Sequence, residues 1–183
     1  MIEFLIRRFV PDWQQVQRTD VRERYGTLAA AVGILSNIFL CIIKGLIGLF
    51  SGSIAVTADA VNNLSDAGSS VITLLAFKIA GKPADEEHPY GHARMEYISG
   101  MAVSFIIILL GLELMGSSFE KILHPEEVGV SALTYLVLIV SIAVKLWQGM
   151  FNRSLGKRIS SEALQATAAD SLNDVFSTGA VLL

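Results

Sequence analysis

The sequence has a single cysteine, little net charge and no segment that fits a cleavable leader. Cys41 has no second cysteine to pair with, which excludes an intramolecular disulfide framework. The formal net charge is −3, so the charge balance does not favour a nucleic-acid partner. Arg7 and Arg8 interrupt the first apolar run, and Pro11 and Asp12 follow where a signal peptide would carry small residues before its cleavage site.

Apolar residues are abundant and are gathered into long runs. The chain is 52% hydrophobic, with a mean hydropathy of +0.55. A helix needs about 20 residues to cross a hydrocarbon core, and these runs lack the polar face that a soluble helix keeps. Five runs reach this length, near 27–50, 53–80, 97–119, 130–150 and 161–183. The sequence therefore predicts an all-α, polytopic membrane helix bundle with five transmembrane helices.

Lysine and arginine mark alternate ends of these runs. They lie before the first run, around the link between the second and third, and around the link between the fourth and fifth: Arg7, Arg8, Arg18, Arg22 and Arg24; Lys78, Lys82 and Arg94; Lys145, Arg153, Lys157 and Arg158. Because basic loops stay in the cytoplasm, we predict a cytoplasmic N-terminus and cytoplasmic loops at 81–96 and 152–160. We expect Lys145 at the cytoplasmic end of the fourth helix, with its ammonium extended toward the interface.

The two ends of the chain carry separate expectations. Residues 1–26 are predicted to be a cytoplasmic, amphipathic lead-in whose apolar side chains touch the membrane interface, and an ordinary solvated tail is the alternative. The remainder, 27–183, is predicted to be one transmembrane domain. Because Leu182 and Leu183 stand within an apolar run, we expect this domain to be cut before a further helix.

Two apolar runs carry pairs of oxygen-bearing side chains four residues apart. Asn62 and Asp66 lie in the second run, and Asp170 and Asp174 lie in the fifth. The spacing places both members of a pair on one helix face, one turn apart. Each pair also falls near the middle of its run. If the two helices touch, the four side chains meet at one depth, near the bilayer midplane.

Charged side chains at this depth need a reason, because each costs about 2.5–3.5 kcal/mol at a helix centre on insertion scales. Three carboxylates close together would repel one another in a low dielectric. A divalent cation would remove that conflict, and protons could replace the cation when it leaves. The pattern therefore favours a cage for metal–proton exchange. The alternative is polar helix–helix contact without an ion.

Other charged groups support simpler interpretations. Lys44, Asp59 and Glu113 fall toward the outer parts of their runs, where an ion pair or a wetted vestibule accounts for them. In the predicted cytoplasmic loop, His88 and His92 follow Asp85, and imidazole with carboxylate is a credible site for zinc or a similar ion. The alternative for that loop is a solvated segment without metal.

Several segments together resemble the cation diffusion facilitator family of metal–proton antiporters. The resemblance covers nearly all of residues 26–183. It is carried by four motifs: Lys44-Gly with Gly-Leu-Phe-Ser-Gly-Ser53, Ala58-Asp59-Ala-Val-Asn62-Asn63-Leu-Ser-Asp66, Pro83-Ala-Asp85 with His88-Pro-Tyr-Gly-His92, and Asp170-Ser-Leu-Asn-Asp174.

This resemblance implies a transport site built by two residues of helix two and two of helix five, here Asn62, Asp66, Asp170 and Asp174. It also implies a second ion in the loop, for which Asp85, His88 and His92 match the pattern. Six helices, a cytoplasmic C-terminal metal-binding domain and a homodimer are further implications. A bacterial cell membrane is the implied location.

The ligand types point to a preferred metal. Zinc members of the family usually have histidine at one or both of the positions that Asn62 and Asp170 hold here. This set is one amide and three carboxylates, and hard oxygen ligands suit manganese, whereas imidazole favours zinc. The set resembles that of bacterial manganese exporters. We predict Mn²⁺ ahead of Zn²⁺, with Fe²⁺ and Co²⁺ as further alternatives.

The predicted function is export of a divalent cation from the cytoplasm by proton-coupled alternating access. No enzymatic activity and no organic cofactor are expected. A cation channel is one rival, but a channel would repeat one residue around a pore rather than pair residues on two helices. A membrane metalloenzyme that uses the loop histidines is another, but the sequence offers no nucleophile or base beside them.

Overall fold

Helices account for all the regular secondary structure in the part of the chain that the computed structural model describes, which is residues 2–51, 54–123 and 132–181. The six helices are α1 (Ile2–Phe9), α2 (Thr19–Ser51), α3 (Ile54–Ala80), α4 (Met95–Leu123), α5 (Ala132–Ile159) and α6 (Glu162–Val181). No strand occurs within these ranges, so the all-α prediction is confirmed. Residues 1, 52–53, 124–131 and 182–183 lie outside the described residues.

Three of the helices are long and apolar enough to cross a membrane: Thr19–Phe50, Met95–Glu113 and Ala132–Ile159. Large apolar side chains such as Leu35, Phe105 and Leu136 remain exposed on them. Exposed apolar surface of this extent is expected where lipid replaces water. The protein is therefore a multi-pass membrane bundle. The other two long helices, α3 and α6, are the ones that carry the predicted site residues.

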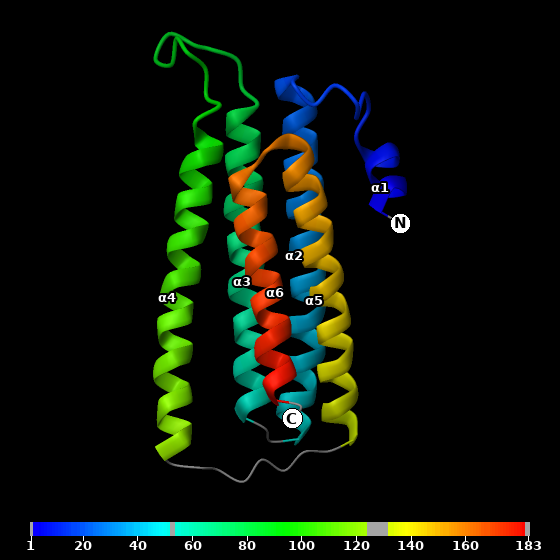
Figure 1. Ribbon diagram of the computed structural model, residues 1–183, viewed down its shortest axis with the longest axis vertical. Coiled ribbons are helices and arrows are strands. Elements are labelled where there is room, and N and C mark those ends of the chain that lie inside the picture. The colour runs from blue at the N-terminus through cyan, green and yellow to red at the C-terminus, as the bar shows by residue number, and fades with distance from the viewer. Residues whose placement is uncertain (1, 52–53, 124–131, 182–183) are drawn as a thin grey trace.

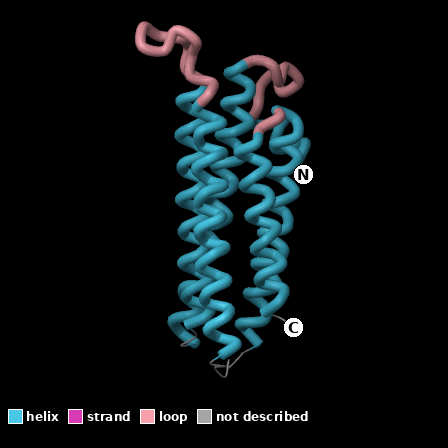
Figure 2. Tube along the Cα trace, turned by 60° about the vertical axis from the view of Figure 1, so that its left-hand side comes forward, coloured by secondary structure: helices cyan, strands magenta, loops and turns pink. Residues whose placement is uncertain are grey.

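The five long helices lie side by side along the length of the molecule (Figures 1 and 2). Helix α2 packs against α3 and α5, and α5 packs against α6. Helix α4 completes the bundle by contacting both α3 and α6. The polar helices α3 and α6 are thus each packed against two of the three strongly apolar helices.

The basic segments of the chain gather at one end of the bundle. The N-terminal residues, the 81–94 loop and the α5–α6 turn lie at the top of Figure 1, whereas α6 ends toward the opposite end. This arrangement agrees with the alternation of basic residues in the sequence.

Helix α1 packs on the bundle by one face. Ile6 and Val10 are fully buried in a hydrophobic core with Tyr25 and Phe151, whereas Phe4 on the other face is 69% exposed. The Tyr25 hydroxyl donates a hydrogen bond of 2.9 Å to the Trp13 carbonyl, which fixes the segment that joins α1 to α2. The N-terminal lead-in is therefore part of the folded domain.

An arginine links three helices at the same end. Arg22 of α2 donates to the carboxylate of Glu96 in α4, with distances of 2.9 and 3.1 Å, and also to the carbonyl of Ile159 at the end of α5. The α5–α6 turn that follows is tight. Ser160 has a left-handed φ of 50°, and Ser161 caps α6 by accepting a 3.4 Å hydrogen bond from the Leu164 amide.

Two helices extend well beyond the predicted spans. Helix α2 begins at Thr19 instead of near 27, and α5 continues to Ile159 instead of ending near 150. The added turns carry Arg22 and Arg153, which lower hydropathy but do not break a helix. Hydropathy therefore indicated the apolar part of each helix and missed its polar extension.

We predict that the contact between α2 and α3 depends on Gly26. A Cβ atom at this position would overlap the Phe77 ring, and overpacking a filled core typically costs about 1–3 kcal/mol. Gly26→Val should therefore lower the free energy of unfolding by about that amount, measured by thermal denaturation in detergent. Gly68 on α3 is the matched control, because nothing lies within 4 Å of its added Cβ. Gly68→Ala should not destabilise, and a Gly26→Val protein as stable as wild type would contradict the prediction.

Candidate metal centre

Three of the four predicted cage residues come together between α3 and α6. Asp66, Asp170 and Asp174 each offer a carboxylate oxygen, and these oxygens lie within 4.8 Å of one another. Asp66 is buried at 5% exposure, and the other two are partly buried. The i,i+4 spacing of Asp170 and Asp174 places both on one face of α6, from which their carboxylates approach Asp66 of α3.

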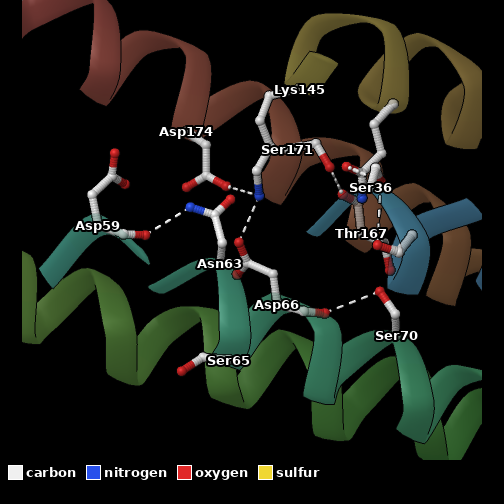
Figure 3. Close-up of polar contacts among 12 residues, drawn as sticks. Ser36, Asp59, Asn63, Ser65, Asp66, Ser70, Lys145, Thr167, Ser171 and Asp174 are labelled. Carbon is white, nitrogen blue, oxygen red and sulfur yellow. Dashed lines mark hydrogen bonds and ion pairs between the residues drawn. The ribbon is translucent and has the colours of Figure 1, made fainter. Parts of the chain in front are cut away.

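Lys145 of α5 also belongs to this cluster. Its Nζ lies 2.5 Å from Asp66 Oδ2 and 2.5 Å from Asp174 Oδ2, and the residue is only 3% exposed (Figure 3). The expectation that its ammonium extends to the cytoplasmic interface is wrong. Because α5 continues to Ile159, Lys145 stands about four turns before the end of the helix. Three clustered acids need a counter-charge, and a lysine within an apolar run was the sequence signal for it.

The predicted amide ligand, Asn62, is half-buried. Its neighbour Asn63 is buried at 1% exposure, and its side-chain nitrogen donates a 2.7 Å hydrogen bond to the Asp59 carbonyl. Asn63 Oδ1 accepts no hydrogen bond from the described residues, and in Figure 3 the side chain points toward the carboxylates. Either position, three or four residues before Asp66, can share its helix face. Asn63 is thus a second candidate for the amide ligand.

A polar layer continues from the cluster along the inside of the bundle. Ser70 donates a 3.0 Å hydrogen bond to the Asp66 carbonyl. Ser70, Thr73 and Thr167 line a small cavity together with Asn152, whose Oδ1 is buried and accepts no hydrogen bond within the described ranges. The oxygen atoms of these side chains line the interior between α3, α5 and α6. They lie between the cluster and the basic end of the bundle.

A second ion pair, between a buried lysine and a partly buried aspartate, lies on the other side of the cluster. Lys44 of α2 is 1% exposed, and its Nζ lies 2.7 Å from Asp59 Oδ2 in α3. The sequence left an ion pair or a wetted vestibule open for these groups, and the structure shows an ion pair between Lys44 and Asp59. Because Lys44 neutralises Asp59, that carboxylate is not a spare ligand for the cluster, whose Asp66 lies about two turns further along α3.

The loop residues Asp85, His88 and His92 also come together. Asp85 Oδ1 accepts a 2.6 Å hydrogen bond from the His88 backbone N–H, and Asp85 Oδ2 lies 3.5 Å from His92 Nε2. Gly91, with a φ of 77°, provides the left-handed turn that brings His92 back toward His88. One ligand atom from each of the three residues fits within 4.8 Å of the other two. The predicted loop residues are therefore grouped as a metal site would require.

The sequence of the chain is similar to those of known proteins. The family model described as the cation efflux transmembrane domain matches residues 30–183. The manganese efflux system protein MneS of Bacillus subtilis is 36% identical over 159 residues, which are 84% of this chain and 55% of that protein. The uncharacterized transporter YdbO of the same organism is 32% identical over 168 residues, 91% of this chain and 58% of that protein.

A further relative is the magnetosome protein MamB of Magnetospirillum gryphiswaldense. It is 31% identical over 148 residues, 81% of this chain and 50% of that protein. The chain therefore spans about half the length of the curated relatives that it matches. Residues 30–183, which the family model matches, contain every residue of both clusters.

We predict that the Asp85 turn persists into acid. The pKa of Asp85 is lowered from 3.8, above all because the His88 backbone N–H donates to its carboxylate. A carboxyl group with a lowered pKa stabilises the folded loop above its unfolded pKa, and this stabilisation is lost as the pH falls through the folded value. In an NMR titration of the metal-free protein, the chemical shift of the His88 backbone amide should therefore change with pH with a midpoint below 3.8.

Asp85→Asn should abolish that titration, and Glu87→Gln, at an exposed acid in the same loop, should leave it unchanged. A midpoint at or above 3.8 would show that the hydrogen bond does not hold the turn.

Proposed function

The chain belongs to the family of cation efflux transmembrane domains, and on this basis we propose that it carries a divalent metal cation out of the cytoplasm. Asp66, Asp170 and Asp174 bind the cation between α3 and α6. The observation that carries the proposal is the grouping of three carboxylates, from two helices, inside a membrane bundle. Like charges this close are unfavourable without a positive partner, and a divalent cation supplies one.

The oxygen ligands favour manganese. Among the residues that the structure describes, no histidine is part of this cluster, and an amide oxygen of Asn62 or Asn63 would make a fourth oxygen ligand. Hard oxygen ligands suit Mn²⁺, whereas zinc sites more often include imidazole or thiolate. The name of the relative MneS, a manganese efflux system protein, supports the same choice. Zn²⁺, Fe²⁺ and Co²⁺ are the alternative cargoes.

The transport cycle that we propose is alternating access. The cluster opens to one side of the membrane at a time, and one or more of the three carboxylates takes up protons when the metal leaves. The basic end of the bundle faces the cytoplasm, and α3 and α6 cross the membrane with the three apolar helices around them. The protein works as a homodimer in a bacterial cell membrane.

A role for the loop cluster follows from its position. Asp85, His88 and His92 lie at the basic end, in the loop that joins α3 to α4. We assign to them a second metal site that contains two imidazole ligands and therefore suits zinc-like ions better than the transport site does.

We predict that the full-length protein in proteoliposomes couples Mn²⁺ uptake to proton counterflow. Asp66→Asn and Asp174→Asn should reduce the rate at least about a hundredfold, since each removes a charged ligand from a buried site. Glu162→Gln is the matched control, because Glu162 is an exposed acid in the first turn of α6. The measurement pairs a metal-sensitive dye with a pH-sensitive dye inside the vesicles. Metal flux without proton flux under a pH gradient would refute antiport.

We predict that histidine ligands shift selectivity toward zinc. The double variant Asn62→His with Asp170→His should raise the ratio of Zn²⁺ to Mn²⁺ transport, because imidazole replaces two oxygen ligands. The double variant Asn63→His with Asp170→His differs only in which amide is replaced. The double variant with the larger shift identifies the amide that faces the ion. An unchanged ratio in both would refute the oxygen-ligand argument.

A further inference from the structure

The Lys145 ammonium occupies the place in the cluster where a bound cation would be expected. Its Nζ bridges Asp66 Oδ2 and Asp174 Oδ2 at 2.5 Å each. The side chain is 4% exposed, and the two carboxylates are 5% and 18% exposed. The bridge joins α5 to both α3 and α6, so that this lysine holds together the three helices that surround the cluster (Figure 3).

A metal ion cannot share these two oxygens with the ammonium without strong repulsion. Metal ions bind carboxylate oxygens at about 2.0–2.2 Å, so an ion bound to Asp66 and Asp174 would lie within a few ångströms of Nζ. Buried charges are poorly screened at such distances. The ammonium therefore has to leave these oxygens when the metal arrives.

The interior offers the displaced ammonium another hydrogen-bond acceptor. The lysine side chain is a flexible stem of four carbons that carries a compact charge. Ser141 lies one turn before Lys145 on α5, and its buried Oγ has no hydrogen-bond partner in the part of the chain that the structure describes. A displaced ammonium can donate to this oxygen without leaving the interior.

The formal charges support an exchange. Three ionised carboxylates and one ammonium sum to −2, and a divalent cation brings the cluster to zero if the lysine stays nearby. Without the lysine the same cluster would sum to −3, and a bound divalent cation would leave −1. With the lysine nearby, the net charge of the cluster is therefore matched by a single cation of charge +2.

We propose that Lys145 is a tethered cation that fills the metal-free transport site and must be displaced by the incoming metal. This proposal rests on the proposed function, because it assigns a positioning residue to the same site. The ammonium competes with the metal for Asp66 and Asp174. It thereby weakens metal binding, speeds metal release and restores the bridge between the helices once the metal has gone.

The test is Mn²⁺ binding to the purified full-length protein in detergent, measured by calorimetry, beside transport in proteoliposomes. Lys145→Gln removes the competing charge, and its Kd for Mn²⁺ should fall about tenfold or more. The maximal transport rate of this variant should fall as well, because release becomes slower. Lys157→Gln, at an exposed lysine on the same helix, is the matched control and should match wild type.

Lys145→Arg keeps the positive charge and tests whether the Kd for Mn²⁺ stays the same or rises. A planar guanidinium binds carboxylates with two parallel hydrogen bonds and is harder to displace. Its Kd for Mn²⁺ should therefore be equal to that of wild type or higher. This variant retains the bridge between the helices, so it tests the proposal even if Lys145→Gln fails to fold.

The outcomes separate this proposal from the proposed function. If wild type binds Mn²⁺, Asp66→Asn does not, and Lys145→Gln binds no tighter than wild type, the transport site stands and the tethered cation is refuted. Tighter binding by Lys145→Arg would refute it as well. If wild type binds no Mn²⁺, or if Asp66→Asn binds it equally well, the proposed function itself fails.

Discussion

The constraint on which the rest of the structure depends is the placement of three carboxylates inside a membrane bundle. Asp66, Asp170 and Asp174 cannot face lipid, and they cannot remain charged together without a positive partner. The protein meets both conditions with other helices. Helices α2, α4 and α5 present apolar surfaces outward and cover the polar helices α3 and α6, while Lys145 of α5 supplies the counter-charge. The packing of the neighbouring helices thus shields the carboxylates from lipid and also supplies their counter-charge.

A second ion pair lies about two turns away on α3, where Lys44 of α2 neutralises Asp59. The two pairs differ in what they leave available. Lys44 meets a single carboxylate, which makes a closed pair between two helices. Lys145 meets two of three carboxylates, which leaves the cluster with excess negative charge. Only the second arrangement retains an electrostatic attraction for a further cation, and this difference separates a structural ion pair from a candidate binding site.

The sequence predicted the helix type, the five long helices and three clustered acids, because hydropathy and i,i+4 spacing act locally. It misplaced Lys145, because the polar turns of α5 beyond residue 150 made the helix look shorter than it is. It chose Asn62 by spacing alone and could not weigh Asn63, because the rotation of α3 about its axis depends on packing against α2 and α4. The docking of α1 through Ile6 and Val10 also depends on distant residues such as Phe151, and local patterns carry no information about these contacts.

The buried aromatic core and the Arg22 contacts lie together at the basic end of the bundle. When contacts at one end fix a helix, a small change in its tilt there produces a larger displacement toward its other end. A helix of 33 residues such as α2 is about 50 Å long, so a tilt of about 5° at the fastened end moves a point about 30 Å away by about 3 Å. A small change in helix tilt, caused by repacking around Tyr25 and Phe151, is therefore enough to displace the other end of a helix by about the diameter of a water molecule.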